Sequence, residues 1–281
     1  FMNGPWRQRS GLWQADVASI VLLILFVLAI FGLEAALQPQ FTPTTLVITG
    51  LVMALVPAVV WLAFFYRRDR LEPEPKHLVL QMVLLGALLA SAIGVPLVDG
   101  LFDVPGWLSS SPAWAQLLGG FLIVGMTQEF LKYAAVRFSV YYAADFNEAI
   151  DGIIYTTAVA IGYALVLNIN FVVSSGGVEL GSGAIRMVLT TLAQASFAGV
   201  VGYFLGRMKF EKRPLWWMPL GLTLAAALNS LFYFLRGNLN QGSLGAVNTW
   251  LGLLLAAVLA GAITWFLSRS IQHDLAVHGG D

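Results

Sequence analysis

Long apolar segments recur along this chain and restrict the folds that it can adopt. Each has the roughly 20 residues that an α-helix needs to cross the hydrocarbon core of a bilayer. The segments cover residues 17–37, 43–66, 77–102, 116–141, 149–173, 184–208, 214–235 and 247–268. Only 11% of the residues are charged, against about 25% in a soluble domain. We therefore predict an all-α fold, a polytopic integral membrane helix bundle of about eight transmembrane helices, as a single domain over residues 1–281.

The basic residues predict the orientation of this bundle. Cytoplasmic loops of membrane proteins are enriched in Lys and Arg. With eight spans and a cytoplasmic N-terminus, only Arg186 and Arg236 fall away from the cytoplasmic ends. The first segment follows Arg7 and Arg9 and exceeds the roughly 7–15 residues of a signal-peptide core, so we expect a signal anchor. Both termini are predicted to be cytoplasmic, in a multi-pass protein of a bacterial inner membrane.

The composition excludes several kinds of site. The chain has no cysteine, which removes disulfides, thiolate metal ligands and a cysteine nucleophile. Its three histidines, His77, His273 and His278, flank apolar segments and lie in none of them. The net charge is zero and there is no basic run, so we expect no nucleic-acid partner. The lipid bilayer is the partner that the composition indicates.

One apolar segment carries charges at its centre. Gln128-Glu129-Phe130-Leu131-Lys132 lies within 116–141. Glu129 and Lys132 are three residues apart and Gln128 and Lys132 are four apart, so they share one helix face. A charge at the centre of a spanning helix costs roughly 2.5–3.5 kcal/mol, and such charges are usually paired and turned inward. The pair is either part of a catalytic site or a structural ion pair inside the bundle, and we favour the structural interpretation.

Side-chain amides recur in the apolar segments that follow. We expect them to form hydrogen bonds between helices, each worth roughly 0.6 kcal/mol on average. They could also line a polar pocket for a lipid headgroup or a substrate. The amides concerned are Gln128, Asn168, Asn170, Gln194 and Asn229.

Two further patterns concern the connections between helices. Asp69, Glu72 and Glu74 follow the second segment. We interpret them either as a solvated interfacial loop, paired with nearby arginines, or as a docking or lid element. Gly202 and Gly206 continue a four-residue spacing of small residues in 184–208, which predicts close contact with another helix.

Four stretches occur in a fixed order between the second and sixth apolar segments. They are Phe65–Pro75, Gln128–Lys132, Phe146–Asn168 and Gln194–Gly206. In these stretches the chain resembles the PrsW family of intramembrane proteases, which belongs with the CaaX-processing proteases. The resemblance implies metal-dependent hydrolysis, in which carboxylates and imidazoles hold an ion that lowers the pKa of a bound water.

The chain departs from the family pattern where the pattern has Glu or His. The substituted positions are Gln128, Leu167, Gln194 and Asn229. A neutral amide is a poor ligand beside a carboxylate, and Leu is no ligand. Glu129 and Lys132 remain and are interpreted as the remnant of a catalytic motif. We therefore predict no metal site and expect no cofactor.

These departures set the predicted function. We expect a PrsW-like pseudoprotease that lacks the metal ligands and is not an enzyme. It would act as a non-catalytic scaffold or accessory subunit that binds other integral membrane proteins in a large multi-subunit complex. The first alternative is an active PrsW-type intramembrane metalloprotease that uses Glu129 and would need zinc. The second alternative is a lipid or small-molecule transporter.

Overall fold

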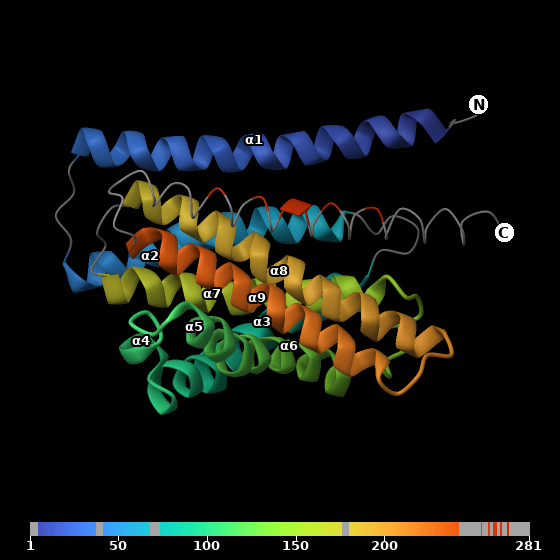
Figure 1. Ribbon diagram of the computed structural model, residues 1–281. Helices are drawn as coiled ribbons and strands as arrows, with labels where there is room; N and C mark the ends of the chain where they lie inside the picture. Colours follow the sequence, from blue (N-terminus) through green and yellow to red (C-terminus); the bar gives the residue numbers. More distant parts are fainter. Residues whose placement is uncertain are drawn as a thin grey trace.

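The computed structural model describes residues 5–37, 42–67, 74–175 and 180–241, together with a few isolated positions after 250. Within these residues the regular structure is entirely helical, which confirms the predicted all-α fold. Figure 1 shows long helices running roughly side by side in one bundle. Most of the eighth predicted segment, 247–268, lies outside the described residues.

Helices occupy the first seven predicted apolar segments. In chain order the elements are α1 (Pro5–Leu37), α2 (Pro43–Tyr66), α3 (Lys76–Leu89), η1 (Ala90–Gly94), η2 (Pro96–Leu101), α4 (Val104–Trp107), α5 (Ala113–Gly119), η3 (Gly120–Gly125), α6 (Met126–Ser139), α7 (Asp151–Ser175), α8 (Leu180–Phe210) and α9 (Trp217–Gln241). Among the described residues, six of these stretches are long and apolar enough to cross a membrane. The fourth predicted segment is not among the six, and it carries Gln128, Glu129, Lys132 and Arg137, which lower its hydropathy. The count of eight spans and the side of each terminus stay predictions.

Helix α7 forms the centre of the bundle. It packs against α2, α3 and α8, while α1 lies along the outside against α2 and α8 (Figure 1). Every residue from Asp151 to Ala164 is buried. This part of α7 is apolar or small on all sides, which is the pattern of a helix enclosed by other helices.

Glycines allow the helices around α7 to approach closely. A Cβ on Gly202 would lie 2.2 Å from the carbonyl oxygen of Gly152, and one on Gly206 would lie 2.0 Å from that of Ala149. The close helix contact predicted from Gly202 and Gly206 is therefore confirmed. A second crossing, between α3 and α7, was not predicted. There a Cβ on Gly162 would lie 1.9 Å from the carbonyl oxygen of Val83.

Three π-helical turns, η1, η2 and η3, interrupt the helices that border the site described below. The N–H of Val95 donates to Ala90 O and that of Met126 donates to Phe121 O, each five residues back. Pro96 opens η2 and has no N–H to donate, which disturbs the α-helical ladder at that point. Turns of this kind are rare and often occur at functional sites.

The segment that leads into α3 is anchored inside the bundle. Glu74 is only 3% exposed, and its carboxylate accepts a hydrogen bond from the hydroxyl of Tyr155 on α7. Its carbonyl accepts another from the hydroxyl of Tyr66 at 2.8 Å. The interpretation as a solvated loop is therefore wrong for Glu74, because α7 supplies a buried partner for it. Asp69 and Glu72 lie outside the described residues.

The crossing between α3 and α7 generates a stability prediction. Gly162→Ala would place a methyl group against the α3 backbone, so we expect the free energy of unfolding to fall by roughly 1–3 kcal/mol, the usual cost of overpacking. Unfolding by SDS in mixed micelles measures the change.

Gly32→Ala on α1 is the matched control. No atom lies within 4 Å of a Cβ placed there, so the stability should stay at or slightly above that of the wild type. Equal stability of both variants would contradict the close crossing.

Candidate functional site

A fully buried ion pair lies between helices α6, α8 and α9. Glu129 and Lys132 are both 0% exposed, and Lys132 Nζ donates to Glu129 Oε1 at 2.7 Å. The same ammonium donates to Gln194 Oε1 on α8 at 2.5 Å. Asn229 Nδ2 on α9 donates to Glu129 Oε1 at 2.7 Å. The predicted pairing of Glu129 with Lys132 on one helix face is confirmed, and two other helices complete it.

The amide of Gln128 connects the same three helices. Its Oε1 accepts hydrogen bonds from Gln194 Nε2 at 2.9 Å and from Asn229 Nδ2 at 3.0 Å. On the α7–α8 interface, Asn168 Nδ2 donates to Thr191 Oγ1 at 3.1 Å. These contacts are the interhelical hydrogen bonds expected from the amides. They keep the polar groups satisfied where no bulk water reaches them.

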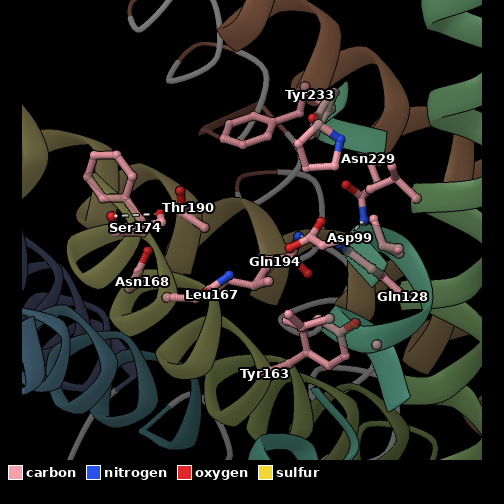
Figure 2. Close-up of a pocket in the computed structure, with 18 of the residues that line it drawn as sticks. Asp99, Gln128, Tyr163, Leu167, Asn168, Ser174, Thr190, Gln194, Asn229 and Tyr233 are labelled. Carbon is pink, nitrogen blue, oxygen red and sulfur yellow. Dashed lines mark hydrogen bonds between the residues drawn. The ribbon is translucent and has the colours of Figure 1, made fainter. Parts of the chain in front are cut away.

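A polar cavity adjoins this cluster. It has a volume of about 230 Å³, room for several water molecules, and helices α6 to α9 and the turns η1 to η3 surround it. Figure 2 shows Gln128, Asn229 and Gln194 on one part of its wall and Asn168 on another. Leu167 also lines the cavity. All four positions at which the chain departs from the family pattern therefore face the same space.

One oxygen of the ion pair is unused. Glu129 Oε2 is buried and has no hydrogen-bond partner among the described residues. The other oxygen, Oε1, is held by Lys132 and Asn229. A buried carboxylate oxygen without a donor is costly, by roughly 1–3 kcal/mol or more, so it marks a place where a ligand or a water would be favourable.

Two residues that line the cavity were missed from the sequence. Tyr163 on α7 and Asp99 on η2 both contribute to its wall (Figure 2). Tyr163 is four residues before Leu167 and so shares a helix face with it, which is a signal that could have identified it. Asp99 lies in a π-helical turn, which sequence periodicity does not reveal.

A second buried polar cluster lies outside the cavity and fixes the connection between α6 and α7. Asp151 Oδ2 accepts the backbone N–H groups of Asn147 at 2.8 Å and Glu148 at 2.6 Å. Lys209 Nζ on α8 donates to the carbonyl oxygen of Phe146. These groups satisfy the backbone of a turn, and we assign them a structural role.

The chain matches known proteins over most of its length. Residues 74–263 match the family described as PrsW family intramembrane metalloprotease. Protease PrsW of Halalkalibacterium halodurans is 32% identical over 65% of this chain and 80% of its own length. The protein of the same name from Geobacillus kaustophilus is 32% identical over 56% and 65%, and that of Bacillus subtilis is 26% identical over 80% and 94%. No solved structure gives a significant match.

These matches correct the predicted function. The relatives are named proteases, so the prediction of a non-catalytic scaffold, pseudoprotease or accessory subunit is wrong, as is the prediction that the chain is not an enzyme. The prediction rested on reading four positions as lost metal ligands. The structure holds a buried carboxylate with one free oxygen, and its hydrogen-bond partner Asn229 lines a polar cavity. The apolar helices and bacterial relatives identify a multi-pass bacterial membrane protein, as predicted.

The buried pair generates a double-mutant prediction. Glu129→Gln leaves the Lys132 ammonium buried without a counter-charge, and Lys132→Met leaves the carboxylate alone. Each should lower the free energy of unfolding by about 3–5 kcal/mol, while the double variant should lose less than the sum of the two. SDS unfolding of the four proteins measures the coupling.

The pair between Arg207 and Glu211 is the control for this cycle. It is partly exposed, with Nη1 and Oε1 2.8 Å apart, so removing it should cost no more than about 1 kcal/mol. If the double variant lost as much unfolding free energy as the two single variants together, Glu129 and Lys132 would not stabilise each other.

Proposed function

The chain belongs to the PrsW family of intramembrane metalloproteases, and on that premise we propose that it hydrolyses a peptide bond of a membrane-protein substrate, with Glu129 as the general base. The observation that carries this proposal is the free carboxylate oxygen, Glu129 Oε2, buried in an apolar bundle on a carboxylate whose hydrogen-bond partner Asn229 lines a polar cavity. A carboxylate in such a place is rare and usually functional.

The donors around Glu129 do not fit a hydrolytic zinc ion. Such a site uses about three protein ligands drawn from imidazole, carboxylate and thiolate groups. In the part of the chain that the structure describes, no group of three or more His, Cys, Asp or Glu side chains could share an ion. In addition, Lys132 Nζ lies between Glu129 Oε1 and Gln194 Oε1, where its charge would repel a divalent cation. The hydrolytic step below therefore uses only side chains of this chain.

Glu129 can activate water directly. Lys132 and Asn229 fix Oε1, so the carboxylate is oriented while Oε2 stays available to accept a proton. A water from the cavity attacks the carbonyl carbon and gives its proton to Oε2, which later passes the proton to the leaving amine. Lys132 supplies the opposite charge 2.7 Å from Oε1, which favours the ionised form of the carboxylate.

The carboxylate lies behind the cavity wall that Gln128 and Asn229 form. Both amides line the cavity, and Asn229 hydrogen-bonds Glu129 Oε1. Water therefore reaches Oε2 when these amides move aside. Catalytic contacts often tighten only when substrate is bound, so the closed wall does not conflict with the role of Glu129.

The cavity suits an unwound segment of a membrane-spanning substrate. Inside a bilayer, a helix satisfies its own backbone groups, and a segment that unwinds for cleavage loses those partners. The amide side chains on the cavity wall supply donors and acceptors in their place. Gln128 Nε2 has no hydrogen-bond partner among the described residues and is one such donor. We therefore propose that the substrate is a single-span protein that unwinds at the scissile bond.

Cleavage of a reporter tests this function. Purified protein in proteoliposomes should cleave a single-span reporter, and Glu129→Gln should lower kcat by roughly 10²–10⁴-fold, the range for loss of a general base. Glu211→Gln, a partly exposed carboxylate on another helix, should leave kcat unchanged. Full activity of the Glu129 variant would exclude the proposed base.

We expect this protein to contain no zinc, in contrast to what the family pattern of metal ligands implies. Elemental analysis of purified protein should find no stoichiometric zinc, and chelators should leave cleavage unchanged, because Lys132 supplies the positive charge. A variant with Gln128→Glu, Leu167→Glu, Gln194→His and Asn229→His should gain zinc, because two added carboxylates and two imidazoles supply ligands and offset the charge of Lys132, and it serves as the positive control. Stoichiometric zinc in the wild type that disappears with Glu129→Ala would contradict the prediction.

A further inference from the structure

Tyr163 has the same unusual property as Glu129. It is 1% exposed, its hydroxyl is buried, and that hydroxyl has no hydrogen-bond partner among the described residues. The residue lines the cavity, and Figure 2 shows it near Gln194 and Gln128. Buried tyrosines usually find a partner for their hydroxyl, so an unpartnered one calls for a ligand.

The surroundings of Tyr163 hold its ring in place. A Cβ on Gly94 would lie 1.8 Å from the hydroxyl oxygen, so only glycine in this π-helical turn leaves room for the hydroxyl. Lys132 Nζ lies 5.6 Å from the centroid of the Tyr163 ring, within the range of a cation–π contact. The ammonium that holds Glu129 Oε1 therefore also packs against Tyr163.

The two unpartnered groups are chemically complementary. Glu129 Oε2 can only accept a proton or a hydrogen bond, whereas the hydroxyl of Tyr163 can donate one. Hydrolysis of an amide needs both functions on opposite sides of one carbonyl group. A base must take the proton of water, and a donor must stabilise the charge that develops on the carbonyl oxygen.

We propose that Tyr163 is a catalytic residue that donates a hydrogen bond to the carbonyl oxygen of the scissile bond. When the water oxygen bonds to the carbonyl carbon, its proton goes to Glu129 Oε2 and the π electrons move to the carbonyl oxygen, where the Tyr163 hydroxyl stabilises them. The C–N bond then breaks, and the proton on Glu129 goes to the leaving nitrogen. This inference rests on the proposed protease function.

Tyr155 on the same helix provides the contrast. It is also fully buried, but its hydroxyl donates to Glu74 and lies outside the cavity. Removing that hydroxyl leaves Glu74 without a donor, whereas removing the hydroxyl of Tyr163 leaves no protein group unsatisfied. Replacing a structural tyrosine by Phe should therefore lower stability and leave the rate unchanged, whereas replacing a catalytic tyrosine should lower the rate and leave stability unchanged.

The experiment compares Tyr163→Phe, Tyr155→Phe and Glu129→Gln with the wild type, using reporter cleavage in proteoliposomes and thermal unfolding in detergent. Tyr163→Phe should lower kcat by roughly 10²–10³-fold with KM within about twofold, the effect of losing one oxyanion donor, and its Tm should equal or exceed that of the wild type. Tyr155→Phe should lower Tm and leave kcat within about twofold.

The outcomes separate this inference from the protease function. If Glu129→Gln is inactive while Tyr163→Phe keeps kcat within twofold, the role of Tyr163 is wrong and the protease function stands. A fall in both kcat and Tm for Tyr163→Phe would make it a structural residue and would also overturn the inference. If the wild type cleaves no reporter, the protease function fails and the role of Tyr163 fails with it.

Discussion

The buried pair of Glu129 and Lys132 is the interaction on which the rest of the site depends. Two opposite charges taken out of water are tolerable only when they stay together and when their remaining donors and acceptors are satisfied. Gln194 on α8 and Asn229 on α9 supply those partners, so three helices meet at one point. The pair therefore fixes the relative positions of α6, α8 and α9, and it leaves one carboxylate oxygen without a hydrogen-bond partner among the described residues.

The close packing of α7 makes this arrangement possible. Glycines on α3, α7 and α8 bring the backbones of these helices into contact. From α7, Tyr163 and Asn168 line the cavity. The π-helical turns next to α3 and α6 contribute Gly94, Asp99 and Val124 to the wall of the same cavity.

The donors around Glu129 are the basis of our proposal that hydrolysis in this chain uses no metal ion. The amides at the substituted positions cannot replace anionic ligands, but they hydrogen-bond one another and the ion pair. An ammonium group then supplies the positive charge at the centre of the cluster. In the proposed mechanism Glu129 is the base and Tyr163 the hydrogen-bond donor, and Lys132 contacts both of them.

The sequence by itself determined the features that depend on local spacing. Apolar runs of helix-spanning length predicted the helices, the three-residue interval predicted the pairing of Glu129 with Lys132, and small residues four apart predicted the contact of Gly202 and Gly206 with another helix. Only the tertiary structure decided which groups lack partners. The burial of Glu74 and the free hydroxyl of Tyr163 depend on residues from distant helices, and spacing along one helix carries no information about them. The predicted loss of function was overturned by neither of these, but by the relatives of the chain, which are named proteases.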